Sequence, residues 1–291
     1  MKLHEHDKYD GSHRARKSFH FFDNVIVCLG TGIENTDSKH NTETTVFQMA
    51  ATDGKAQNYW KNYVAGNGKS WLDHAGTGYY TPQPVKFTGL VKQESRMQNT
   101  DKQTEGQWAS LYFDHGKAPK NASYEYAVMP QTTREKIDAF AAAPTYKVLR
   151  ADNEAHIVSS DATHTVSYVL FETPKDVLPG GPLLKADTTC LAMVRMINSK
   201  KILLTVTQPD LALYRGPNDD IYKDGKRVER SVYSRKWRSN ASQEIPVRVT
   251  LRGKWNFTGN DAIKLVEQTK KSTTIEFVCT DGLSFNVELE K

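Results

Sequence analysis

Short apolar runs separated by turn residues dominate the chain. Asp23 and Asn24 lie between two such runs, and this pair favours a tight turn. Tyr124, Tyr126 and Val128 repeat with the period of two that is typical of a strand with one buried face. Further strands are predicted over 44–49, 85–91, 108–113, 146–150, 156–160, 165–171, 190–197, 202–207, 247–251, 275–279 and 283–289. Residues 264–268 fit a helix or a strand equally well.

Turn signals predict how several of these strands connect. Asn198–Lys200 predicts a hairpin between its flanking strands. Asp281 and Gly282 form one of the strongest short hairpin signals, and they predict a second hairpin near the end. Residues 174–182 contain three prolines and two glycines, which indicates a loop.

One helix interrupts the strand pattern. Thr132 and Glu135 have the spacing of a capping box, and good helix formers follow until Pro144. We interpret this short helix as the connector between two β-rich blocks, with domains at 1–145 and 146–291. Many short strands and few helices predict an all-β protein, an antiparallel β-sandwich followed by a smaller C-terminal β-sandwich.

Length and composition narrow the class of protein. A chain of 291 residues is long enough for two domains with substantial cores. It contains no apolar run of about 18 residues, so we expect no membrane-spanning helix, and its first residues lack the apolar core of a signal peptide. Cys28, Cys190 and Cys279 all lie in apolar, strand-like runs, so we expect buried thiols rather than disulfides or a zinc site.

The charge is concentrated in one segment. The net charge is +5, and residues 226–238 hold six basic residues against Glu229 alone. Such a cluster favours a polyanion. The candidate carbohydrate-binding residues here are Arg227, Arg230, Arg235, Lys236 and Arg238, with Trp237 placed to stack on a sugar. A solvated loop explains the cluster about as well. We do not expect nucleic acid as the partner, because no recognition-helix or RNP-like pattern accompanies the cluster.

A second candidate sugar contact is the pair Tyr79 and Tyr80, which follows Gly76 and Gly78. Flat rings beside backbone amides can hold a sugar. Glycines at a turn followed by core tyrosines explain the same residues, and this alternative stays open.

Two Asp-His pairs, Asp73-His74 and Asp114-His115, could suggest a base and its orienting carboxylate. Adjacent strand residues point to opposite faces, however, and both pairs come just before a turn-like stretch containing Gly, so a turn role is favoured. His4, His6 and Asp7 could hold a metal, but a frayed terminus is the better explanation. We therefore predict no catalytic residue, no metal and no cofactor.

Several longer stretches resemble one known family. They are ARKSFHFFDNVIVCLGTGIENTDSKHNTETTVFQ from Ala15, SWLDHAGTGYY from Ser70, TEGQWASLYFDHGKAPKNASYEYAVMPQTT from Thr104 and YKVLRADNEAHIV from Tyr146. TVTQPDLAL and RGKW extend the likeness toward the end of the chain. Taken in this order, the stretches resemble the C-terminal β region of chondroitin sulfate ABC lyases. These enzymes belong to polysaccharide lyase family eight, together with the hyaluronate, chondroitin AC and xanthan lyases.

The resemblance implies a large parent enzyme, periplasmic or secreted, in which β-sandwich domains follow a helical toroid. It implies β-elimination, in which a proton leaves C5 of a uronic acid and the 4-linked sugar departs. The family's catalytic His, Tyr and Arg belong to the toroid, and a supporting Glu precedes the stretches quoted above, so none of these roles is carried over to a residue of this sequence. The resemblance makes 1–145 the late part of the central supersandwich and 146–291 the C-terminal β domain. It implies sulfated glycosaminoglycan and the toroid as partners, and a cut supersandwich is expected to self-associate.

Overall fold

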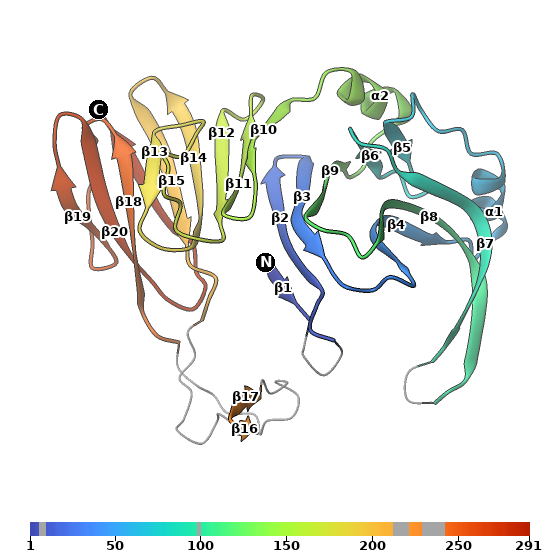
Figure 1. Ribbon diagram of the computed structural model, residues 1–291. Coiled ribbons are helices and arrows are strands. Elements are labelled where there is room, and N and C mark those ends of the chain that lie inside the picture. The colour runs from blue at the N-terminus through green and yellow to red at the C-terminus, as the bar shows by residue number, and fades with distance from the viewer. Residues whose placement is uncertain (6–9, 98–99, 212–220, 229–241) are drawn as a thin grey trace. The chain divides into compact units, whose positions relative to one another are not determined.

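The computed structural model describes residues 1–5, 10–97, 100–211, 221–228 and 242–291 (Figure 1). Within them the fold is all-β, as predicted: antiparallel sheets, with two short helices. The described chain divides into two compact units, one of residues 1–5 and 12–147 and one of residues 10–11 and 148–291. No helix in the described residues is long and apolar enough to cross a membrane.

The first unit contains two antiparallel sheets. The six-stranded sheet has the order β1 (Lys2–His4), β2 (Arg14–Phe22), β3 (Val25–Glu34), β9 (Ala122–Met129), β6 (Gly78–Tyr80) and β5 (Ser70–Leu72). The three-stranded sheet has the order β4 (Asn41–Ala50), β8 (Gln103–Lys117) and β7 (Lys86–Arg96). Phe113 of β8 stacks on Tyr124 of β9 with ring centroids 5.7 Å apart, so the two sheets share a core.

Two helices belong to this unit. The sequence prediction missed α1 (Gly54–Lys61), which Asp53 caps by accepting from the Ala56 amide at 2.7 Å. The second, α2 (Arg134–Ala142), was predicted as a connector, but it packs on β5 and β6 with Ile137 fully buried. Its cap is Thr133, one residue beyond the predicted Thr132.

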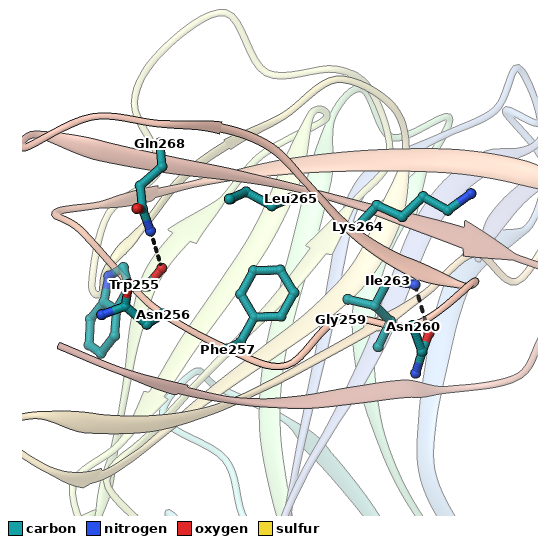
Figure 2. Close-up of a pocket in the computed structure, with 9 residues that line it drawn as sticks. All are labelled: Trp255, Asn256, Phe257, Gly259, Asn260, Ile263, Lys264, Leu265 and Gln268. Atoms are coloured by element: carbon teal, nitrogen blue, oxygen red, sulfur yellow. Dashed lines mark hydrogen bonds between the residues drawn. The ribbon is translucent and has the colours of Figure 1, made fainter.

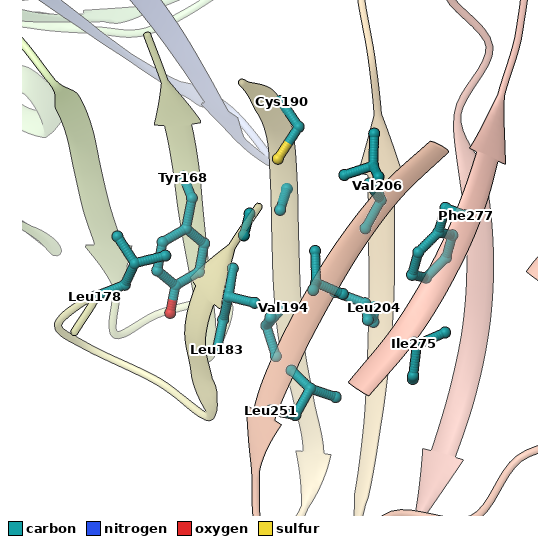
Figure 3. Packing of buried hydrophobic residues seen from close by; sticks show 14 of the residues in the cluster. Tyr168, Leu178, Leu183, Cys190, Val194, Leu204, Val206, Leu251, Ile275 and Phe277 are labelled. Carbon is teal, nitrogen blue, oxygen red and sulfur yellow. The ribbon is translucent and has the colours of Figure 1, made fainter. Parts of the chain in front are cut away.

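The second unit is a sandwich of two antiparallel sheets. The six-stranded sheet has the order β10 (Tyr146–Ala151), β11 (Ala155–Ser160), β12 (Thr165–Leu170), β14 (Cys190–Asn198), β15 (Lys201–Thr207) and β21 (Phe285–Glu290). The four-stranded sheet has the order β13 (Leu183–Ala186), β18 (Ile245–Arg252), β20 (Ser272–Cys279) and β19 (Ile263–Gln268). The alternating residues of both sheets, among them Val194, Leu204, Leu251 and Phe277, form one continuous core (Figure 3).

The strand connections test the turn predictions. Asp23 adopts a positive φ between β2 and β3, and Asn198 pairs with Lys201 in the β14–β15 hairpin, so both turns are confirmed. The predicted hairpin at Asp281-Gly282 is wrong, although both residues have the positive φ of a tight turn. The strand β20 already pairs with β18 and β19 on its two sides, so the turn leads into the other sheet, where β21 pairs with β15. The ambiguous stretch 264–268 is the strand β19.

Candidate functional site

The predicted basic cluster lies mostly outside the described residues. Arg227 is on β17 (Lys226–Val228), which forms a two-stranded hairpin with β16 (Ile221–Lys223). Arg230, Arg235, Lys236, Trp237 and Arg238 all fall outside the described residues. The cluster therefore stays a prediction.

Tyr79 and Tyr80 are brought together on β6, but both rings are in the core and only 8% exposed. The Tyr79 hydroxyl donates to the Asp73 carboxylate at 3.0 Å, and burial raises the pKa of Tyr79 so that it stays a donor. Tyr80 packs edge-on against Phe140 and Tyr146. This geometry matches the alternative of a turn followed by core tyrosines, and it leaves little ring surface for a sugar.

The first Asp-His pair builds a turn. The carboxylate of Asp73 is buried and accepts from the backbone amides of Ala75 and Thr77 at 2.9 and 2.8 Å. The His74 side chain is exposed and lies against Tyr59 and Trp60, with centroids 6.3 and 5.9 Å away. The Asp73 carboxylate therefore stabilises the turn, which is the role that the sequence favours for this pair.

In the second pair, the side chains of Asp114 and His115 bind different partners. Asp114 accepts from Lys86 Nζ at 2.5 Å and from Asn41 Nδ2 at 3.0 Å, and the bond from Lys86 lowers the pKa of its carboxyl. His115 shares a hydrogen bond with the Thr44 hydroxyl at 2.9 Å, and burial lowers the pKa of its imidazole. The carboxylate and the imidazole therefore serve different partners rather than one proton relay.

The cysteines behave as small core residues. All three are buried free thiols, and burial raises the pKa of Cys28 to about 11 and that of Cys190 to about 12. The described residues hold no group of three or more His, Cys, Asp or Glu side chains suited to a metal ion. His4 lies on β1, whereas His6 and Asp7 lie outside the described residues.

A groove that the sequence prediction missed lies at one edge of the second unit, where a segment of residues 255–260 crosses between two strands. The Trp255 carbonyl accepts from the Gln268 side chain of β19 at 2.6 Å. Asn256 exchanges two backbone hydrogen bonds with Glu290 of β21, at 2.7 and 2.9 Å. The segment is thus fixed on both sides, and Trp255, only 1% exposed, closes the end of the core.

Beside this segment the open groove has a volume of about 480 Å³, and an adjoining open hollow on the β21 side has a volume of about 590 Å³. The two share Asn256, Phe257, Asn260 and Ile263. Figure 2 shows the Phe257 ring in the middle, with Asn256 to one side and Asn260 to the other. Hollows of this size accommodate a small ligand. In the sequence, the feature that comes nearest to indicating the groove is the alternation of apolar and polar residues at Trp255, Asn256 and Phe257.

Comparisons with known proteins identify the family. Residues 1–141 match the model of the super-sandwich domain of polysaccharide lyase family 8. The whole chain is 58% identical to a chondroitin sulfate ABC exolyase of Bacteroides thetaiotaomicron, and 89% of it is 37% identical to one of Proteus vulgaris. The chain spans only 29% and 26% of the length of these two relatives.

Solved structures show the same fold at low identity. A chondroitin AC lyase of Streptomyces coelicolor A3 matches 99% of this chain with a TM-score of 0.69 and 18% identity, and the match covers 34% of that protein. A Paenibacillus xanthan lyase matches all of it, also with a TM-score of 0.69, over 27% of its own length. The chain therefore belongs to polysaccharide lyase family 8, with its super-sandwich domain in residues 1–141, and it is similar throughout to a stretch of the chondroitin sulfate ABC lyases.

Proposed function

We propose that this chain is the C-terminal β-sandwich portion of a glycosaminoglycan lyase that cleaves chondroitin or dermatan sulfate by β-elimination. Its role there is that of a scaffold, and its partners are the preceding domains of a periplasmic or secreted parent. The observation that carries the proposal is the 58% identity over the whole chain to an exolyase of which it spans 29%.

The chemistry of elimination explains why we assign the scaffold role. The reaction needs a group that neutralises the uronate carboxylate, a base for the proton at C5 and an acid for the leaving oxygen. The two Asp-His pairs are the nearest approach to such a set among the described residues. Asp73 is buried under a turn, and Asp114 is bound by Lys86, so neither carboxylate is available to orient a base. We therefore expect the isolated chain to have no lyase turnover.

A chimera tests both halves of this proposal. In the Bacteroides relative, the stretch that aligns with this chain is replaced by this chain, and ultraviolet absorbance follows the unsaturated product from chondroitin sulfate. We expect the chimera to turn over substrate and the isolated chain to give no product at any dose. A folded chimera without activity would contradict the family role, and dose-dependent product from the isolated chain would contradict the scaffold role.

A second candidate function is a carbohydrate-binding module that grips sulfated polysaccharide through the basic cluster. It is favoured by one observation, the six basic residues against one acidic residue in 226–238. Immobilised chondroitin sulfate should then retain the chain in a salt-sensitive manner. Retention should fall when Arg227, Arg230, Arg235 and Arg238 are replaced by Ala, and unchanged retention would reject this function.

A further inference from the structure

The groove in the second unit has an apolar floor made by side chains that a closed sandwich would bury. Phe257 is only partly buried, although it packs against the core of the unit. Leu265 on the edge strand β19 is 52% exposed, and Ile263, which also lines the groove, is buried in the core. A phenyl ring with an open surface in a concave site offers a flat contact to the C–H face of a pyranose ring.

The rim of the groove carries polar groups that no described residue satisfies. The Asn260 side-chain oxygen accepts from the amides of Ala262 and Ile263 at 2.9 Å each, which fixes the side chain and leaves its Nδ2 group without a partner among the residues that the structure describes. The carboxamide of Asn256 and the ammonium of Lys264 likewise form no hydrogen bond or ion pair with any described residue. The rim thus offers donors and acceptors to a ligand that carries hydroxyl or amide groups.

The charges around the groove favour an uncharged ring over a polysulfated one. Lys264 is the cation in the lining of the smaller hollow, whereas Glu288 and Glu290 line the adjoining one. Both carboxylates are more than half exposed, and Lys201 pairs with them at 2.6 and 3.2 Å. Lys201 and Lys264 together balance Glu288 and Glu290, so these side chains leave no surplus of positive charge to attract sulfate esters.

We propose that this groove binds an uncharged N-acetylhexosamine ring, stacked on Phe257 and hydrogen-bonded to Asn256 and Asn260. The apolar floor also suits the methyl of the acetamido group, and the amides of the rim suit its N–H and C=O. The site lies entirely in the second unit and uses none of the basic cluster, so it is separate from both functions proposed above.

The full chain is tested by saturation-transfer NMR with N-acetylgalactosamine as the probe, and with glucuronate and a sulfated chondroitin disaccharide for comparison. We expect transfer to the N-acetylgalactosamine ring and methyl protons, and weaker transfer to the two charged probes. Phe257→Ala should weaken binding about tenfold, since the stacking surface is removed. Asn256→Ala removes a side chain without a partner among the described residues, so it should weaken binding while leaving thermal unfolding unchanged.

Two further variants make the test decisive. Phe257→Leu keeps apolar bulk in case Phe257→Ala unfolds, and it should still lose most of the transfer to the ring. Val177→Ala removes an apolar side chain that is 63% exposed elsewhere in the same unit, so it should bind like the wild type. Equal binding by wild type, Phe257→Leu and Asn256→Ala would overturn the proposal, as would stronger binding of the sulfated probe.

Discussion

Replacing Tyr168 by Phe should make the second unit more stable, against the usual direction of core substitutions. Tyr168 on β12 is fully buried among apolar residues such as Leu178 and Leu183 (Figure 3). Its hydroxyl has no hydrogen-bond partner among the described residues, and burial raises its pKa, so it stays neutral. A Cβ added at Gly181 would lie 2.6 Å from the hydroxyl oxygen, so the backbone of this glycine covers the group closely.

The magnitude follows from two opposing terms. A buried hydroxyl without a partner costs about 1 to 3 kcal/mol. Removing the oxygen leaves a void on the order of 10–15 Å³, which at about 24 cal/mol per Å³ costs about 0.3 kcal/mol. The free energy of unfolding of the Tyr168→Phe variant should therefore rise by about 0.7 to 2.7 kcal/mol, which is roughly 1 to 11 °C in Tm for a unit of this size.

Tyr79→Phe provides a matched control with the opposite sign. The Tyr79 hydroxyl donates to the Asp73 carboxylate at 3.0 Å, and hydrogen bonds to charged groups are worth about 1.5 to 3 kcal/mol. Urea unfolding followed by hydrogen-exchange mass spectrometry reports each unit separately, through the amides of β12 and β14 for one and of β6 and β9 for the other. A decrease of more than about 0.5 kcal/mol in the free energy of unfolding of the second unit in Tyr168→Phe would refute the reasoning, because it would mean that the hydroxyl has a hydrogen-bond partner.

Three further predictions concern titration, association and thiol chemistry. The pKa of Asp114 is lowered, so its contribution to stability is fully present above about pH 4 and is lost as the pH falls through the lowered value. The stability difference between wild type and Asp114→Asn should accordingly shrink below about pH 4 in acid unfolding, and a difference that grows there would contradict this sign. Phe19 and Phe21 are 49% and 62% exposed on β2, and we expect these apolar rings to promote self-association. The double variant Phe19→Ser, Phe21→Ser should therefore self-associate less than the wild type in sedimentation. A wild type that stays monomeric at high concentration would reject this prediction. Cys190, buried with its pKa raised to about 12, should react with a thiol reagent only after unfolding, and fast native labelling would disprove its burial.

Local sequence patterns predicted most of the strands. They did not predict which strands pair when the pairing depends on residues far away in the sequence. The alternation at 247–251 and 124–128 is that of half-buried strands, and β18 and β9 lie there. Asp281-Gly282 has the turn conformation that its sequence indicates. A turn does not decide which strand edge is free, however, and β20 has both edges occupied before the chain reaches β21.

The helix caps show the same limit on a smaller scale. Thr132 and Thr133 are both capping residues by type, and only Thr132 has a glutamate at the spacing of a capping box. In the fold the Thr132 amide donates to the Gly76 carbonyl at 2.8 Å, so this residue is held by the neighbouring turn. The cap therefore moves to Thr133, which accepts from the Lys136 amide at 3.4 Å.

The groove was beyond sequence reasoning for a related reason. Trp255 and Phe257 share the inward side of their segment, yet only Trp255 is buried. The difference arises because β19 is an edge strand, so no further strand among the described residues covers the ring of Phe257. Gly259 holds the segment close, since a Cβ there would lie 2.7 Å from the Ile263 carbonyl. A Gly259→Ala change should therefore displace residues 255–260 and distort the groove. The backbone amides of the strands in the sandwich core should keep their protection from hydrogen exchange.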